Sequence, residues 1–331
     1  MKILLVKLSS LGDIVHTLPV VQDILAVMPD AHIDWVAEKA FAPLFIQVNG
    51  LHRIILCELR HWRKSPLAAQ TRSAFLAFKA DLRKERYDTV IDLQGLTKSA
   101  VVARLANLAP RGKRYAMANQ TDGSGYEAPT RWVADVAVAL EPHVHAVQRG
   151  RLLAAKALGY TTDVTDRPAN YGLNTAVAQS KRAQGASKNI AFIHGTSRLD
   201  KTWPLQNWVA LGQRLVANGY QLALLHGNAQ ELATSQAIAA QLAGNSIVLP
   251  MLALDALTQT LAQCAGVIGV DSGVSHIAVA LGLPHVQIYN FDTAWRTGPL
   301  KCAHQVSVFD QPRPTVDAVW RAWLQCESAV S

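Results

Sequence analysis

Short apolar runs alternate with longer stretches of helical periodicity along the whole chain. In the first half the apolar runs occupy residues 2–8, 32–36, 53–57 and 89–93. In the second half they occupy residues 189–194, 221–226, 246–249, 267–270 and 285–289. The helical stretches between them include 13–27, 65–84, 205–218, 229–242, 254–264, 273–281 and 315–325. Continuous apolar strands that alternate with helices indicate parallel sheets buried on both faces.

The strand count predicts an α/β protein with two doubly wound, Rossmann-like domains. Each half of the chain offers at least four strands, and 331 residues suit two domains. We expect one domain over residues 1–165 and the other over 186–331. The linker between them, 166–185, is rich in Thr, Asp, Asn and Gln and contains a polar helical stretch at 174–182.

Composition narrows the class of protein. Half of the residues are hydrophobic and 17% are charged, which favours a large buried core over disorder. No apolar run approaches the roughly 18–20 residues of a membrane span, and the N-terminal run ILLV is too short for a signal peptide. We therefore expect a cytoplasmic protein. The four cysteines show no C-x-x-C spacing, which disfavours a disulfide framework or a zinc site.

The charge is uneven along the chain. The net charge is +8, with +6 in residues 1–165 and +2 in residues 166–331. Three short basic clusters lie in the first half, at 60–64, 83–86 and 111–114. A basic surface attracts phosphates, carboxylates or an anionic membrane. A solvated basic face without any partner explains the same pattern equally well.

The turn after the first strand is the first candidate site. Ligands of open α/β sheets bind beyond the carboxyl ends of the strands. There the sequence reads Ser-Ser-Leu-Gly-Asp, and Gly12 allows a tight turn while Asp13 falls at the start of a helix. Asp13 is placed to accept a proton from an attacking hydroxyl group. The structural alternative, a helix-capping Asp, is the more common use of this residue.

The second candidate is the strand–turn–helix of residues 269–276. The N–H groups of Ser272, Gly273 and Val274 would lie at a helix start, which binds phosphate without a cation. Asp271 and Ser272 could instead only cap the helix, and His276 could be a core residue. The turn matches neither G-x-G-x-x-G nor the P-loop, which argues against a standard dehydrogenase or a P-loop kinase.

Two further segments fall on the same expected sheet edge. Residues 194–204 offer the hydroxyls of Thr196 and Ser197 and the charge of Lys201, which suits a diphosphate. Glu231 follows the next strand, where a carboxylate could bind both hydroxyls of a ribose. A polar loop with a solvated Lys, and an exposed Glu in a first helical turn, are the alternatives. No D-x-D, H-E-x-x-H or Cys–His spacing supports a metal held by the protein.

Taken in order, these segments resemble the lipopolysaccharide heptosyltransferases, and within that family the type I enzymes. The matching segments are KILLVKLSSLGDIVHTLP, RHWRK, VIDLQGLTKSA, HAVQR, HGTSRLDKTWP and VDSGVSHIAVALGLP. The resemblance implies the GT-B fold, two Rossmann-like domains facing across a cleft. It implies transfer of L-glycero-D-manno-heptose from ADP-heptose to Kdo of Kdo2-lipid A, with inversion at the anomeric carbon. Alternatives are a type II heptosyltransferase, another nucleotide-sugar GT-B enzyme, or a non-catalytic sugar-nucleotide-binding module.

The resemblance also assigns residues and partners. Asp13 matches the catalytic base. The expected donor-binding residues are Thr196, Ser197, Lys201, Glu231, Leu252, Asp271, Ser272, Gly273 and His276. The expected acceptor-binding residues are Ser10, Gly12, Arg60, Arg63, Lys64, Gln94 and Lys98. No resident cofactor, metal or nucleic acid is expected, and an anionic inner-membrane surface is expected to hold the protein peripherally on its cytoplasmic side.

The chain departs from the family pattern at two places. Ser272 stands where Thr is usual, which keeps the hydroxyl group. Residues 290–292 read Asn-Phe-Asp where Gly-Pro-Thr is common. The second departure argues against a phosphate-binding role for that loop and could alter the fit around the donor sugar.

Overall fold

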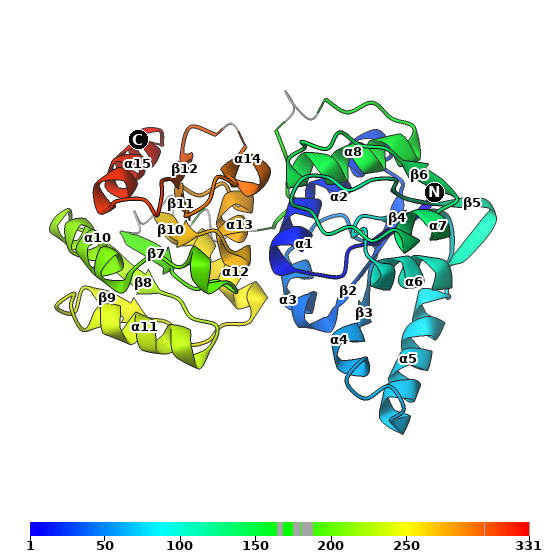
Figure 1. The fold of residues 1–331 in the computed structure, drawn as a ribbon, viewed down its shortest axis with the longest axis horizontal. Helices are drawn as coiled ribbons and strands as arrows, with labels where there is room; N and C mark the ends of the chain where they lie inside the picture. The colour runs from blue at the N-terminus through cyan, green and yellow to red at the C-terminus, as the bar shows by residue number, and fades with distance from the viewer. Residues whose placement is uncertain (164–167, 175–179, 181–187, 301, 331) are drawn as a thin grey trace. The chain divides into compact units, whose positions relative to one another are not determined.

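The computed structural model describes residues 1–163, 168–174, 180, 188–300 and 302–330. The chain divides into two compact units, Met1–Gly172 (unit 1) and Leu173–Ser331 (unit 2), each built on its own sheet (Figure 1). Most of the polar helix expected over 174–182, and much of the expected linker 166–185, lies outside the described residues. The domain bounds 1–165 and 186–331 stay predictions.

The sheet of unit 1 has six parallel strands in the order β3-β2-β1-β4-β5-β6. They are β1 Lys2–Val6, β2 His32–Glu38, β3 Arg53–Cys57, β4 Arg86–Asp92, β5 Asn107–Met117 and β6 Val136–Val138. The apolar run of β1 forms its centre, because Ile3 to Val6 are all 0% exposed. β1 pairs with β2 on one side and β4 on the other, so the chain order reverses beside it. Ligands bind at the carboxyl ends of strands at such a reversal.

Helices cover both faces of this sheet (Figure 1). α4, α5 and α6 share one core with β1 and β4, whereas α8 packs with α1 and α2. The helices are α1 Leu11–Thr17, α2 Pro19–Val27, α3 Ala42–Phe45, α4 Leu59–Trp62, α5 Ala69–Leu82, α6 Thr97–Leu105, α7 Pro129–Val133 and α8 Ala146–Leu158, with a 3-10 turn at Lys39–Phe41. The single helix expected over 13–27 is two helices, because Pro19 has no N–H to donate to the preceding turn.

The sheet of unit 2 repeats this plan, with the order β12-β11-β10-β7-β8-β9. The strands are β7 Asn189–Ile193, β8 Gln221–Leu224, β9 Ser246–Val248, β10 Gly266–Val270, β11 His285–Tyr289 and β12 Gln305–Phe309. Its helices are α10 Leu205–Ala217, α11 Ala229–Ala239, α12 Leu254–Ala262, α13 Gly273–Ala280, α14 Ala294–Thr297 and α15 Val316–Ser328, with a 3-10 turn at Leu199–Lys201. The order reverses between β7 and β10, and buried aromatic residues such as Trp208 and Trp323 fill the core. The prediction of two doubly wound α/β sheets is therefore confirmed.

Three strands of these sheets were absent from the sequence prediction. β5 contains Pro110 and Gly112 among charged residues, a pattern that predicts a loop. Its pairing with β4 is irregular between Tyr87 and Thr89. β6 is a sheet edge of only three residues, VAV, and β12 is a sheet edge in which apolar and polar residues alternate. Their strand structure comes from pairing with a neighbour rather than from local pattern.

The helices are short compared with a bilayer. α5 has 14 residues, and α8, α10 and α15 have 13 each, whereas a span needs about 20. Across the described part of the chain, no helix has the length and hydrophobicity to cross a membrane.

Candidate active site

In unit 1 the turn after β1 holds a carboxylate at the carboxyl edge of the sheet. Ser10 is the N-cap residue of α1, and Asp13 is the third residue of the helix. The Asp13 carboxylate accepts hydrogen bonds from the Ser10 N–H at 3.0 Å and the Ser10 hydroxyl at 2.8 Å. Asp13 therefore does cap the helix, as the structural alternative held. Its side chain nevertheless remains 38% exposed, so the cap fixes a carboxylate that a substrate can still reach.

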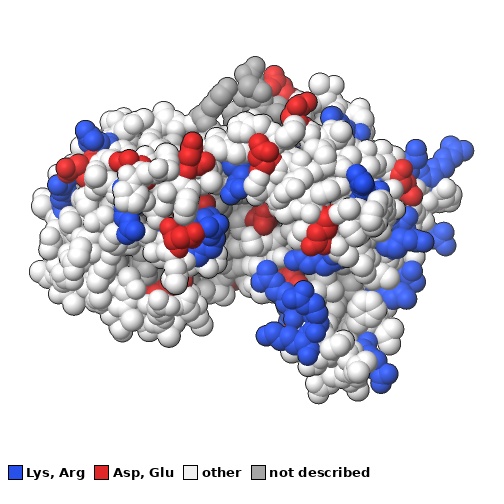
Figure 2. Space-filling model, viewed as in Figure 1, with Lys and Arg blue, Asp and Glu red and all other residues white. Residues whose placement is uncertain are grey.

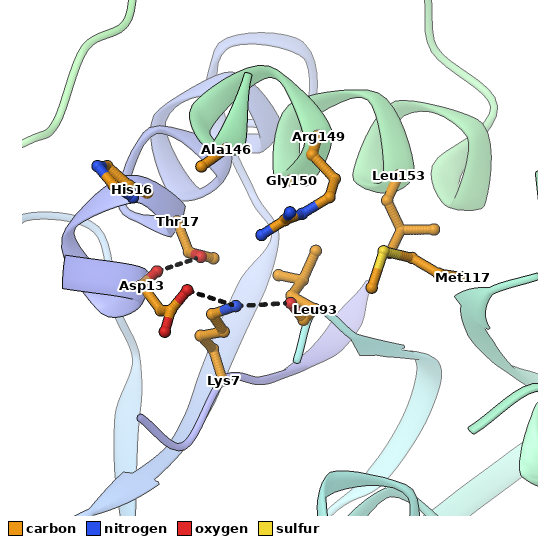
Figure 3. Close-up of a pocket in the computed structure, with 10 residues that line it drawn as sticks. All are labelled: Lys7, Asp13, His16, Thr17, Leu93, Met117, Ala146, Arg149, Gly150 and Leu153. Atoms are coloured by element: carbon orange, nitrogen blue, oxygen red, sulfur yellow. Dashed lines mark hydrogen bonds and ion pairs between the residues drawn. The ribbon is translucent and has the colours of Figure 1, made fainter. Parts of the chain in front are cut away.

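Two cations lie beside Asp13. Lys7 Nζ is 3.8 Å from Asp13 Oδ1 and donates to the Leu93 carbonyl at 2.9 Å, and the lysine is only 2% exposed. Arg149 extends from α8 toward the same place (Figure 3). Burial raises the pKa of Asp13, but Lys7, the Ser10 donors and Arg149 outweigh it and bring the pKa below its ordinary value. Asp13 is thus a carboxylate at neutral pH.

Asp13 borders a small pocket between α1 and α8 (Figure 3). The lining residues are Lys7, Asp13, His16, Thr17, Leu93, Met117, Ala146, Arg149, Gly150 and Leu153. The Thr17 hydroxyl donates to the Asp13 carbonyl at 2.7 Å and so adds a hydrogen bond across the last turn of α1. The side of the pocket next to Asp13 is cationic, and an ionised hydroxyl group would be stabilised there.

A second layer of polar residues supports the turn from β4 and α6. Gln94 Oε1 accepts from the N–H groups of Leu8 and Ser9, at 3.0 and 3.1 Å, and Lys98 donates to the Ser9 hydroxyl at 2.9 Å. Asp92 in turn accepts from the Gln94 N–H, and its burial raises its pKa to about 6. Gln94 and Lys98 therefore lie at the Asp13 edge of the sheet, where they hold the turn in shape.

The basic cluster of the α4 turn lies beyond the carboxyl end of β3. Arg60, Arg63 and Lys64 are exposed, and the Arg60 N–H donates to Glu38 Oε1 at 3.3 Å. Lys and Arg side chains gather on the surface near α4 (Figure 2). These cations are free to meet an anion from solvent.

In unit 2 a buried carboxylate follows β10 and joins three segments. Asp271 Oδ2 is 2.5 Å from Lys201 Nζ, and Oδ1 is 3.4 Å from His276 Nε2. The Thr196 hydroxyl donates to the Asp271 carbonyl at 3.4 Å. Burial opposes ionisation, but His276 and Lys201 hold the pKa of Asp271 far below its ordinary value. Asp271 thus orients a cation, and the Asp271 carboxylate itself would repel a phosphate.

The segments that follow β7 and β8 lie against each other at Gly195. The Glu231 carboxylate accepts from the Gly227 N–H at 2.7 Å and packs against Gly195. A Cβ atom at Gly195 would lie 2.4 Å from Glu231 Cδ, so a larger residue there would displace the end of the Glu231 side chain. The glycine brings the predicted ribose-binding carboxylate up to the Thr196 segment.

The remaining predicted donor residues share this edge of the sheet. Ser272 is the N-cap of α13 and accepts from the Ser275 N–H at 3.4 Å, which leaves Gly273 in the first turn. Ser197 is exposed in the loop after β7, and Leu252 is half-buried in the turn between β9 and α12. The described residues contain no group of three or more His, Cys, Asp or Glu arranged to hold a metal ion.

Residues 75–319 match the sequence model of glycosyltransferase family 9 (heptosyltransferase). The chain belongs to this family. It is 34% identical to lipopolysaccharide heptosyltransferase 1 of Escherichia coli K12, over 87% of this chain and 88% of that one. Lipopolysaccharide heptosyltransferase 2 of the same strain is 26% identical, over 91% of this chain and 86% of that one.

A solved structure also supports membership of this family. The E. coli heptosyltransferase WaaC with ADP aligns with a TM-score of 0.85 and 31% identity, over 97% of this chain and 98% of that chain. The expected GT-B fold is thereby confirmed, and this family member is a glycosyltransferase.

Neither cation of the Asp13 pocket, Lys7 or Arg149, was predicted as a site residue from the sequence. In the sequence, Lys7 is the only polar residue between the apolar run of β1 and the Ser-Ser turn. A charged residue in such an apolar segment is unusual, and this signal could have identified Lys7 as a site residue. Arg149 lies in the segment HAVQR, which contributed to the resemblance, but neither charge nor spacing indicated that α8 would carry it to Asp13.

Proposed function

We propose that this protein transfers L-glycero-D-manno-heptose from ADP-heptose to a Kdo hydroxyl group of Kdo2-lipid A, and so adds the first heptose of the lipopolysaccharide core. The observation that carries the proposal is the accessible Asp13 carboxylate, kept ionised beside Lys7 and Arg149. The higher identity to heptosyltransferase 1 than to heptosyltransferase 2 favours Kdo2-lipid A over its heptosylated product as the acceptor.

The donor is proposed to bind unit 2. Its diphosphate would lie against the N–H groups at the start of α13, where the helix dipole favours negative charge. Lys201, oriented by Asp271, would supply the cation, and Thr196, Ser197 and His276 would surround it. Glu231 is proposed to bind the ribose hydroxyls and Leu252 to contact the nucleoside. Fixed donors of this kind stabilise the charge that develops on departing ADP.

The acceptor chemistry is proposed to take place at Asp13. Asp13 removes the proton of the Kdo hydroxyl group as its oxygen attacks the anomeric carbon of the heptose. The bond to the diphosphate breaks on the opposite face, and its electron pair leaves with ADP. This single displacement inverts the anomeric configuration. Ser10, Gly12, Gln94 and Lys98 would shape the acceptor site, and Arg60, Arg63 and Lys64 would meet the acidic groups of the acceptor.

Product analysis tests the function directly. The purified protein is mixed with ADP-heptose and Kdo2-lipid A, and the products are identified by mass and by the anomeric configuration of the new linkage. We expect one added heptose with inverted configuration. Transfer only to the already heptosylated acceptor would favour the type II activity, use of UDP-sugars would favour another GT-B enzyme, and donor binding without turnover would favour a binding module.

We further infer that the α4–α6 face of unit 1 meets an anionic membrane surface on the cytoplasmic side. Residues 59–105, which contain α4, α5 and α6, hold ten Lys or Arg and four Asp or Glu, a net charge of +6 out of +8 for the whole chain. Leu67 and Leu76 are 88% and 61% exposed in the same region. Exposed cations such as Arg63, Lys64 and Arg72, close in the chain to these exposed leucines, suit an anionic lipid surface.

Vesicle sedimentation tests this inference. Vesicles that contain phosphatidylglycerol should bind the protein, and neutral phosphatidylcholine vesicles should not. Leu67→Ser with Leu76→Ser should weaken binding several-fold, whereas Ile247→Ser, at an exposed position of unit 2, should not. Equal loss with Ile247→Ser, or equal binding to neutral vesicles, would refute the assignment of this face.

A further inference from the structure

One side chain that follows β11 binds the backbone on both sides of Lys201. Asn290 directly follows β11 and is only 9% exposed. Its Nδ2 donates to the carbonyl oxygen of Asp200 at 2.9 Å and to that of Thr202 at 3.0 Å. These two carbonyls flank Lys201 on either side. One amide group therefore fixes the backbone on both sides of the lysine.

The amide of Asn290 has one orientation that fits this place. If it were rotated by half a turn, its oxygen would face two carbonyl oxygens, and both hydrogen bonds would be lost. In the observed orientation Oδ1 is buried and has no hydrogen-bond partner among the residues that the structure describes. A buried oxygen without a partner is unfavourable, so the two donated bonds must offset its cost. At this place the Asn290 side chain therefore acts only as a hydrogen-bond donor.

A second contact ties the same two loops together. The Arg198 guanidinium lies over the ring of Phe291, 5.7 Å from its centroid, and Arg198 pairs with Asp200. Lys201 itself reaches Asp271 from this loop. The segment after β11 therefore packs along the Lys201 loop rather than standing apart from it.

We propose that Asn290 is a positioning residue, which clamps the backbone around Lys201 and so places the lysine ammonium for the donor diphosphate. The inference rests on the proposed role of Lys201 in donor binding. It gives the segment 290–292 a function through its hydrogen-bond donors, without direct contact with a phosphate.

The test is a double-mutant cycle on ADP affinity, measured by calorimetry, together with the KM values of both substrates. Asn290→Ala should weaken ADP binding and raise the ADP-heptose KM about tenfold, the factor that corresponds to 1.4 kcal/mol, and leave the acceptor KM unchanged. In a Lys201→Ala background the same change should have no further effect on ADP affinity. A residue that only stabilised the fold would lower ADP affinity equally in both backgrounds.

The chain offers a matched control. Gln305 is also buried, and its Nε2 donates to two carbonyls, Val279 and Leu283, both at 3.1 Å, at the opposite end of α13 from Ser272. Gln305→Ala should lower the melting temperature as Asn290→Ala does but leave ADP affinity within twofold. Asn290→Leu, which keeps the volume and removes the donors, gives the same reading if the alanine variant does not fold.

The outcomes separate the two proposals. If Lys201→Ala leaves ADP affinity unchanged, the proposed role of Lys201 is wrong, and the inference about Asn290 is lost with it. If Lys201→Ala weakens ADP binding but Asn290→Ala and Asn290→Leu do not, only the positioning role is wrong. An equal effect of Gln305→Ala on ADP affinity would also overturn it.

Discussion

Lys7→Met should move the acid limb of the pH–rate profile toward neutral pH. Lys7 is the charged group that lowers the pKa of Asp13 most, and its Nζ lies 3.8 Å from Asp13 Oδ1. Methionine keeps the length of the side chain and removes its charge. Because Lys7 lowers the pKa of Asp13, its removal must raise that pKa. Turnover requires ionised Asp13, so activity should be lost at a higher pH than in the wild type.

The distance gives the size of the shift. Two unit charges at this separation interact by about 1 kcal/mol in water and by about 4 kcal/mol at an effective dielectric constant of 20. Asp13 is 38% exposed, so solvent screening places the interaction toward the lower limit, at about 1–2 kcal/mol. One pKa unit corresponds to 1.36 kcal/mol. The acid limb should therefore rise by about one pH unit.

The assay is kcat/KM for the acceptor as a function of pH, at saturating ADP-heptose. Lys98→Met is the matched control, because Lys98 contacts the same turn through the Ser9 hydroxyl. It should leave the acid limb in place even if the rate changes. An acid limb in Lys7→Met at the wild-type pH, or one shifted to lower pH, would refute the electrostatic reasoning about Asp13.

Three other predictions concern single contacts. Asp13→Asn should leave ADP-heptose affinity near wild type while turnover falls by about two orders of magnitude or more, and turnover within a few-fold of wild type would remove Asp13 from the role of base. Gly195→Ala should weaken ADP binding with little change in the urea unfolding of unit 2, because its Cβ would lie 2.4 Å from Glu231 Cδ and push the end of that flexible side chain away; unchanged ADP affinity would mean that the position of Glu231 does not matter for ADP binding. Arg151→Met should destabilise unit 1 by about 3–5 kcal/mol, because it leaves Asp23 buried without its 2.6 Å partner, and adding Asp23→Leu should recover most of that loss; no recovery would show that the pair itself is not the cause.

The low pKa of Asp13 has a consequence for catalysis. A carboxylate stabilised by two cations is a weaker base than one whose pKa lies near 7. The same cations, however, stabilise the negative charge that grows on the attacking oxygen. On the proposed mechanism, Lys7 and Arg149 therefore lower the basicity of Asp13 and at the same time stabilise the attacking oxygen.

The strands at the sheet centres were predictable because their sequences are almost entirely apolar. β1 and β10 are continuous apolar runs, and such runs are stable only between two layers of helices. The turns after them were predictable as sites, since the carboxyl ends of parallel strands share an edge. The sequence alone thus determined two α/β units and a small set of candidate polar residues.

Which residues act together was decided by the tertiary structure. Arg149 lies 136 positions after Asp13 in the chain, and only the packing of α8 beside α1 brings the two together. Asn290 is likewise distant from Lys201, and its hydrogen bonds depend on where β11 ends relative to the loop after β7. β5 is a strand because it pairs with β4 and β6. Local pattern encodes what a segment buries, whereas contacts between distant segments follow from how the buried faces pack.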